Sequence, residues 1–276
     1  MSIPVPEMTG VPKPLRPSPL LPLGRLWSCD ADLPILLYHK VQPVAGDPWT
    51  VTVAELDRQW DYLRSCGYQA IACSDLVRHL NREAALPRRP VLITFDDGYA
   101  NNLLHAYPLL ERHGLRATVF LPAKFVGGEN QWDGGGERLL NYGELRSMSP
   151  EVVEFGLHSY AHDNYRRMSL GQIEADLRKC LAEFERHELP FVRALAYPYG
   201  GDPQRRIFGR RDVRRLLAAL GIECGLRLGN RTNRLPIGNR YSIRRIDIRR
   251  DDTLEMFAGK LGARRNVRRP ALDRAG

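Results

Sequence analysis

Strand-like and helix-like segments alternate along most of this 276-residue chain, and that alternation constrains the fold more than any other feature. Short apolar runs typical of strands lie at residues 34–38, 68–71, 91–95, 117–121, 152–157, 193–197, 222–226 and 241–248. Helical spacing separates them, at residues 53–66, 74–81, 101–113, 170–188, 210–220 and 253–261, with Ser74 and Ser169 as expected N-caps. Repeated βα units form parallel sheets with right-handed crossovers. Seven or eight such strands fit a closed barrel better than an open sheet, so we predict an α/β fold, a deformed (β/α)7-type barrel, as a single domain over residues 33–262.

The two ends of the chain differ from this middle part. Residues 1–32 form a Pro-rich leader, whose one apolar stretch, residues 20–26, is interrupted by Pro22 and Gly24. No secretory signal and no run of about 20 apolar residues is visible, so we expect a cytoplasmic location. The five cysteines are odd in number and lack CxxC spacing, which favours reduced thiols over a disulfide framework.

Positive charge is concentrated in the C-terminal quarter. Residues 201–276 contain 20 Lys/Arg and 8 Asp/Glu, a balance of +12, and residues 263–276 make a basic C-terminal tail. Such a surface suits an anionic partner, although a solvated charged face is the simpler interpretation. No nucleic-acid-binding motif accompanies the arginines, so we expect no nucleic acid partner and keep a peripheral contact with an anionic membrane surface. The oligomeric state is not indicated.

Four of the predicted strands end in polar residues. These strand ends are His39, the pair Asp96 and Asp97, His158, and Pro198 with Tyr199. The carboxyl ends of the strands of a parallel barrel meet at one face, so we expect these residues to form one site. Gly98 permits a turn that lets both aspartates serve that site.

His158 and His162 are four residues apart. On a helical turn, two imidazoles at this spacing share a face and can chelate one ion. With one carboxylate they make a three-ligand site with an open position, which is usual for catalytic zinc and suits other divalent metals. An isolated pair of this kind is more often two surface histidines, so the metal hypothesis depends on the neighbouring aspartates.

Three motifs occur in a characteristic order, Thr94-Phe95-Asp96-Asp97-Gly98, then His158-Ser159-x-x-His162, then Tyr197-Pro198-Tyr199-Gly200. Together they resemble the motifs of the NodB-homology polysaccharide deacetylases, carbohydrate esterase family 4. The resemblance covers roughly residues 33–226. It implies a deformed (β/α) barrel and metal-dependent removal of N-acetyl, or sometimes O-acetyl, groups from an acetylated glycan.

The resemblance also implies roles for the first two motifs. Asp96 would be the catalytic base. Asp97, His158 and His162 would hold one divalent metal ion, with Zn²⁺ expected first and Co²⁺, Ni²⁺ or Fe²⁺ as alternatives.

In the third motif, Pro198 and Tyr199 would line the substrate groove, and the Tyr199 backbone N–H would hold the developing oxyanion. Ser159, inside the histidine motif, is a further candidate for the site.

The third motif departs from the family pattern in one position. Many members carry an arginine two residues before the proline, where it orients the base, and here that residue is Ala196. Either another arginine substitutes, for which the sequence offers Arg244 or Arg245, or the base is held in a different way.

The general-acid histidine of the family usually lies on a late strand, but no histidine follows His187. The early segment at residues 35–41 resembles the opening strand of the biofilm poly-N-acetylglucosamine deacetylase branch, whose barrel is circularly permuted. The first and last strands of a closed barrel are neighbours, so moving this strand in sequence preserves the site. We therefore predict His39 as the general acid, with a histidine that only caps a strand as the alternative.

Two other functions stay open at this point. The same fold could hydrolyse a non-peptide C–N bond in a small cyclic amide, as allantoinase-like relatives do. The chain could also be a non-catalytic glycan-binding or scaffold protein of exopolysaccharide assembly, which Ala196 and the basic C-terminal quarter would suit.

Overall fold

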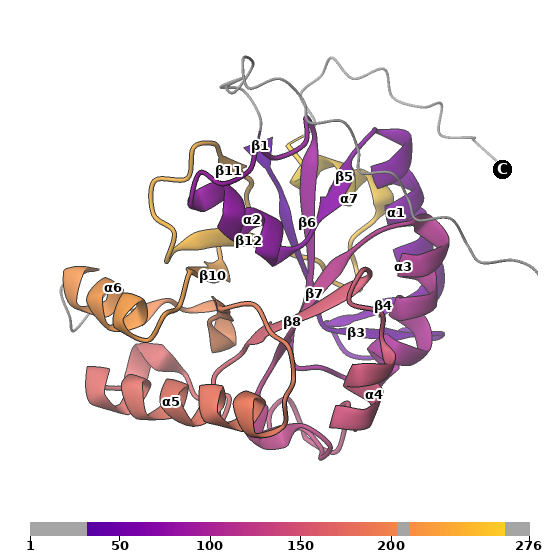
Figure 1. The fold of residues 1–276 in the computed structure, drawn as a ribbon. Helices are drawn as coiled ribbons and strands as arrows, with labels where there is room; N and C mark the ends of the chain where they lie inside the picture. Colours follow the sequence, from indigo (N-terminus) through magenta and orange to yellow (C-terminus); the bar gives the residue numbers. More distant parts are fainter. Residues whose placement is uncertain (1–31, 204–209, 263–276) are drawn as a thin grey trace, which may run out of the picture.

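Seven parallel strands close into a barrel in the computed structural model, which describes residues 32–203 and 210–262 (Figure 1). In ring order the strands are β2 (Ile35–Tyr38), β12 (Ile243–Asp247), β10 (Cys224–Leu228), β9 (Ala194–Ala196), β8 (Val153–Leu157), β7 (Ala117–Leu121) and β6 (Pro90–Phe95). β2 pairs with β12 on one side and with β6 on the other, and these pairings close the ring. The predicted α/β barrel is therefore confirmed. The Pro-rich leader and the basic tail lie outside the described residues.

Short strands supplement the barrel. β5 (Gln69–Ile71) pairs with the first half of β6, β1 (Asp32–Leu33) pairs antiparallel with β11 (Asn233–Arg234), and β3 (Lys40–Gln42) pairs parallel with β4 (Thr50–Thr52). The β3–β4 pair was not predicted from the sequence. It matters for the site because it directly follows the end of β2.

Helices surround the barrel, with α1 and α3 on one side and α5 and α6 on the other (Figure 1). Their bounds are α1 (Val53–Ser65), α2 (Cys73–Leu80), α3 (Tyr107–His113), α4 (Tyr142–Ser147), α5 (Leu170–Arg186), α6 (Arg210–Ala219) and α7 (Leu254–Lys260). Among the described residues, none of these helices has both the length and the apolar character that a membrane span requires.

The helices follow the predicted positions closely, with three differences. Ser169 caps α5 as predicted, but α2 begins one residue early, so that Ala72 stands at its N-cap and Ser74 does not. The stretch before α3 opens as a π-helical segment, Asn102–Ala106. α4 was not predicted, because its six residues show too little apolar periodicity to be read from the sequence.

Two apolar clusters sit on opposite faces of the strands. The larger one packs the outer faces of the strands against the helices. Six of the seven barrel strands contribute to the smaller one, through Ile35, Leu92, Phe120, Ala194, Ala196, Cys224, Leu226 and Ile243. Only the lumen of the barrel is shared by so many strands, so this cluster fills the barrel interior and closes it below the site.

The four described cysteines, Cys66, Cys73, Cys180 and Cys224, are buried and free. Burial raises the pKa of the Cys180 thiol well above its usual value, and does the same for Cys73 and Cys224. They serve as small core residues rather than reactive thiols.

Candidate active site

Strand β6 brings two adjacent aspartates to the carboxyl end of the barrel. All six of its residues are buried, and Asp96 and Asp97 follow it directly. Asp97 has φ 70° and Gly98 has φ 69°, so the chain turns sharply here, as predicted. A Cβ at Gly98 would lie 2.4 Å from the Leu121 side chain, so this turn requires glycine in both conformation and space.

Asp97, His158 and His162 form a buried group of potential metal ligands. Asp97 Oδ1 lies 3.5 Å from His158 Nε2 and 3.2 Å from His162 Nε2. One ligand atom from each residue lies within 4.8 Å of the others. Asp97 Oδ1 is buried and has no hydrogen-bond partner among the described residues. A buried carboxylate oxygen facing two imidazole nitrogens fits a divalent cation, since a neutral pocket would leave that oxygen uncompensated.

The protonation of these groups suits metal binding. His158 Nδ1 lies 2.8 Å from the carbonyl oxygen of Ala196, so Nδ1–H donates to it and Nε2 keeps its lone pair. Burial lowers the pKa of His158 to about 4, which keeps the imidazole neutral at pH 7. Burial alone would raise the pKa of Asp97, but the neighbouring His162 and His158 outweigh burial and hold that pKa well below its usual range.

The two histidines do not share a helical turn, and that prediction is wrong. Residues 158–162 form an irregular loop in which Ser159 has φ 66° and His162 has φ 56°. The carboxylate of Asp176, on α5, accepts the backbone N–H groups of Tyr160 at 2.8 Å and of residue 161 at 3.2 Å. These hydrogen bonds replace those a helix would make, and the left-handed residues turn both imidazoles toward Asp97.

Arg245 holds the carboxylate of Asp96, whose Oδ2 lies 3.8 Å from His158 Nε2. The guanidinium donates to both carboxylate oxygens, with Nη1 2.6 Å from Oδ1 and Nη2 2.7 Å from Oδ2. Arg245 is fully buried in the lumen, above the Phe120 ring. Burial would raise the pKa of Asp96, but the charge of Arg245, with a smaller contribution from His158, outweighs burial and lowers that pKa.

Of the two predicted arginines, Arg245 therefore reaches Asp96 and Arg244 does not. Successive residues of a strand face opposite sides, and Arg244 packs outside the barrel against Gly229. Ala196, at the position of the family arginine, contributes its carbonyl group to His158 instead.

His39 lies at the same end of the barrel, directly after β2. Tyr38 and Phe95 are register partners, so His39 and Asp96 directly follow the ends of neighbouring strands. The His39 imidazole also contributes to lowering the pKa of both Asp96 and Asp97. His39 is half-buried, and its Nδ1 has no hydrogen-bond partner among the described residues. The structure thus brings His39 to the aspartates, while its predicted role as general acid stays a prediction.

The third motif completes the rim. Pro198 is buried, whereas Tyr199 is 57% exposed, and its ring lies 4.8 Å from the His162 ring. Tyr199 has φ 55°, a conformation that turns its side chain outward beside the ligand group. Ser159 is fully buried, and its hydroxyl has no partner among the described residues.

Two residues of this site were missed from the sequence. Trp132, in the Gly-rich loop at residues 127–136, donates from Nε1 to Asp97 Oδ2 at 3.1 Å. Asp247, the last residue of β12, is buried, and its Oδ1 has no partner in the described part of the chain. Its register partner is Leu37, two residues before His39. No motif marks either residue; only the closed ring of strands could have pointed to Asp247.

Comparison with known proteins decides the family. The family model for polysaccharide deacetylase matches residues 83–225, just over half of the chain. The chain belongs to the polysaccharide deacetylase family. The part of the chain that matches the family model contains Asp96, Asp97, His158, His162, Pro198 and Tyr199.

Curated relatives of this family match over part of their length. The chain is 26% identical over 170 residues to the Bacillus subtilis protein named "Putative polysaccharide deacetylase YxkH", covering 62% of this chain and 57% of that protein. It is 24% identical over 161 residues to the poly-β-1,6-N-acetyl-D-glucosamine N-deacetylase of Staphylococcus aureus, covering 55% of this chain and 54% of that protein. The chain thus spans a little over half the length of the relatives it matches.

Solved deacetylases share the barrel. The Streptococcus pyogenes deacetylase PplD, in complex with acetate, aligns with a TM-score of 0.69 and 18% identity over 84% of this chain and 99% of that one. IcaB from Ammonifex degensii aligns with a TM-score of 0.68 and 24% identity over 84% and 98%. At these identities the comparison establishes the fold.

Proposed function

We propose that this deacetylase-family chain is a metal-dependent hydrolase that removes N-acetyl groups from an N-acetylhexosamine-containing glycan or its precursor. The observation that carries the proposal is that the two adjacent carboxylates have different surroundings. Asp97 Oδ1 faces two imidazole nitrogens and is otherwise unpartnered, whereas both oxygens of Asp96 are held by Arg245. A binding or scaffold protein has no need for two buried carboxylates in such different surroundings.

Asp97, His158 and His162 are the residues that would hold the cation. A divalent ion bound there would act as a Lewis acid on the acetamide carbonyl. The ligand set of two imidazoles and one carboxylate suits Zn²⁺, and also Co²⁺, Ni²⁺ or Fe²⁺.

The remaining residues would move the protons. Asp96, kept ionised by Arg245, would accept a proton from the attacking water. His39, on the neighbouring strand, would donate a proton to the departing amine. The backbone N–H of Tyr199 would donate to the developing oxyanion, and its exposed ring would meet the sugar.

The substrate class is supported by the relatives. One curated relative is named for acting on poly-β-1,6-N-acetyl-D-glucosamine. The early strand β2 pairs with β12 and β6 and ends next to His39, as the resemblance of residues 35–41 to the opening strand of this branch implies. We therefore place a β-linked N-acetylglucosamine oligomer first among the candidates.

Acetate release tests the proposal. Purified protein would be stripped with a chelator, reloaded with Zn²⁺ or Co²⁺, and incubated with β-1,6-linked and β-1,4-linked N-acetylglucosamine oligomers. We expect acetate from the reloaded protein and none from the stripped protein. No acetate from either linkage after reloading, or undiminished release after stripping, would contradict the proposal. Hydrolysis of a small cyclic amide in place of the oligomers would favour the allantoinase-like alternative.

A further inference from the structure

Trp132 contacts two of the three residues that we assign to the cation. Its indole Nε1–H donates to Asp97 Oδ2 at 3.1 Å, and its ring stacks on the His162 ring with centroids 3.9 Å apart and an interplanar angle of 23°. Trp132 is almost fully buried. One side chain therefore fixes both a carboxylate and an imidazole.

The contact with Asp97 is selective between its two oxygens. Oδ2 accepts the indole N–H, whereas Oδ1 is buried, unpartnered among the described residues, and faces His158 and His162. The indole donor holds one oxygen of the carboxylate, which fixes the group with its other oxygen toward the imidazoles. Without that donor, the carboxylate could rotate away from this orientation at little cost.

The loop that carries Trp132 is itself tied down by buried polar contacts. Asn130 Nδ2 donates to the Trp132 carbonyl oxygen at 2.7 Å, and Asn130 Oδ1 accepts the backbone N–H of Glu137 at 2.8 Å. Asn130 is 2% exposed. Tyr99 and Phe125 pack with Trp132 in a small separate cluster. The loop is therefore a fixed support and not a loose connection.

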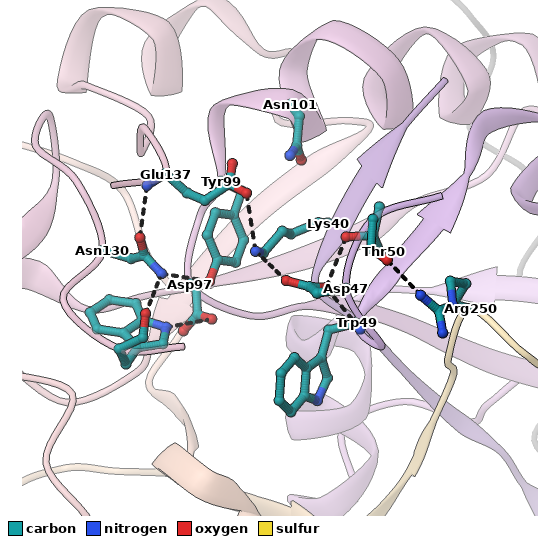
Figure 2. A network of polar contacts seen from close by, with 12 residues as sticks. Lys40, Asp47, Trp49, Thr50, Asp97, Tyr99, Asn101, Asn130, Glu137 and Arg250 are labelled. Atoms are coloured by element: carbon teal, nitrogen blue, oxygen red, sulfur yellow. Dashed lines mark hydrogen bonds and ion pairs between the residues drawn. The ribbon is translucent and has the colours of Figure 1, made fainter. Parts of the chain in front are cut away.

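A buried lysine links this support to the strand end of His39. Lys40 lies between Asp47, at 2.6 Å, and Glu137, at 3.2 Å, and sits over the Tyr99 ring, as Figure 2 shows. Burial alone would lower the pKa of Lys40, but the two carboxylates outweigh it and raise that pKa, so the lysine stays charged. Lys40 and the Gly-rich loop are thereby joined in one polar network through Glu137.

We propose that Trp132 is a positioning residue for the metal ligands, which holds Asp97 through its indole N–H and His162 through ring stacking. The inference rests on the proposed function, since it concerns the cation that Asp97, His158 and His162 would bind. Hydrogen-bond partners of metal ligands typically contribute 10-fold to 100-fold to metal affinity. No sequence motif marks this residue.

Trp132→Phe tests the proposal because phenylalanine keeps an aromatic ring against His162 but removes the indole donor, together with part of the ring volume. Zn²⁺ affinity would be measured by competition with a chromogenic chelator. We expect the dissociation constant of Trp132→Phe to rise about 10-fold to 100-fold. Trp49→Phe, in which the half-buried tryptophan near Arg249 is changed, is the matched control and should bind Zn²⁺ as the wild type does.

A second readout separates positioning from general loosening. In the Co²⁺ form, freeing Asp97 Oδ2 would let both carboxylate oxygens bind, and the visible absorption of Co²⁺ should weaken as the coordination number rises. Thermal unfolding of the metal-free variants would verify the fold. If Trp132→Phe does not fold, Asn130→Ala takes its place, because it releases the same loop without touching a ligand, and it should raise the dissociation constant in the same direction.

The outcomes are distinct. Wild-type protein that binds Zn²⁺ tightly, with a folded Trp132→Phe of equal affinity and unchanged Co²⁺ absorption, would overturn the role of Trp132 and leave the proposed function standing. Wild-type protein that binds neither ion would overturn both. A weakened Trp132→Phe beside an unaffected Trp49→Phe would support the inference.

Discussion

At the scale of single residues, the two adjacent aspartates show how surroundings assign chemistry. Asp96 and Asp97 share one turn, yet Arg245 holds the first and two histidines with Trp132 hold the second. Both pKa values are lowered, so both carboxylates are ionised near neutral pH. We propose different roles for them because Arg245 donates to both oxygens of Asp96, whereas Asp97 Oδ1 has no hydrogen-bond partner among the described residues.

Arg245→Lys tests the support of the base. A lysine keeps the charge but reaches only one carboxylate oxygen, so Asp96 loses its fixed orientation. We expect turnover to fall about 100-fold, the effect of misplacing a catalytic group by about 1 Å. Weaker pairing also raises the pKa of Asp96, so the acidic limb of the pH–rate profile should move to higher pH.

The adjacent Arg244→Lys is the control for that change, since Arg244 packs outside the barrel. It should leave turnover and the pH–rate profile unchanged. Equal effects of the two substitutions, or no effect of Arg245→Lys, would show that the buried ion pair does not orient the base.

At the scale of elements, regular periodicity predicted the strands and helices well, and irregular backbone was where prediction failed. The histidine loop is the clearest case, because four-residue spacing suggested a helical turn while Asp176, 14 residues later, provides an alternative set of hydrogen bonds. Trp132 was missed for the same reason. A Gly-rich loop has no regular spacing of apolar residues from which the direction of its side chains can be predicted. The choice between Arg244 and Arg245 needed the register of β12, which residue types do not reveal.

The turn after β6 is the element that places both aspartates. Gly98→Ala would put an L-residue at φ 69°, at about 1–2 kcal/mol, and force its Cβ against Leu121, at a further ~1–3 kcal/mol. The free energy of unfolding in urea should fall by the sum of these two costs, and Zn²⁺ binding should weaken.

Gly114→Ala is the matched comparison, with φ 61° and no atom within 4 Å of the added Cβ. It should lose only the conformational part, about 1–2 kcal/mol, and bind Zn²⁺ normally. A Gly98→Ala variant as stable as Gly114→Ala would argue against a tightly packed turn.

Helix α5 supports the histidine loop through Asp176. Asp176→Ala removes the acceptor of two backbone N–H groups and of the Tyr165 hydroxyl. Each buried group left unpaired costs about 1–3 kcal/mol, so we expect a loss of at least about 2 kcal/mol in urea unfolding and weaker Zn²⁺ binding. Glu174→Ala, which breaks a surface ion pair with Arg178 on the same helix, should change the free energy of unfolding by less than about 1 kcal/mol. Similar losses in the two variants would contradict the role of Asp176.

At the scale of the whole molecule, ring closure makes distant parts of the sequence neighbours. β2 pairs with β12 and β6, so His39, Asp96 and Arg245 come from neighbouring strands although His39 and Arg245 are 206 positions apart in the sequence. The sequence indicated the barrel and the motif residues, because each stands at a strand end. It could not indicate Asp247 or the polar network around Lys40, since both depend on which strands become neighbours.

The predicted membrane contact belongs to the basic C-terminal quarter, residues 201–276, of which residues 263–276 lie outside the described part of the chain. With five arginines in residues 263–276, each worth about 1 kcal/mol near an anionic surface, we expect salt-sensitive binding to vesicles containing anionic lipid. Removal of residues 263–276 should abolish it in a sedimentation assay. Vesicle binding that changes with neither salt nor truncation would contradict this proposal.

The central claim is that the two aspartates divide the work, Asp97 holding the cation and Asp96 taking the proton. The most direct measurement compares bound Zn²⁺ and acetate release in Asp96→Asn and Asp97→Asn after identical loading, with thermal unfolding to verify both folds. We predict that Asp96→Asn retains near-stoichiometric Zn²⁺ and loses at least about 100-fold in turnover, whereas Asp97→Asn loses both. An active Asp96→Asn, or an Asp97→Asn that binds Zn²⁺ as the wild type does, would contradict the account.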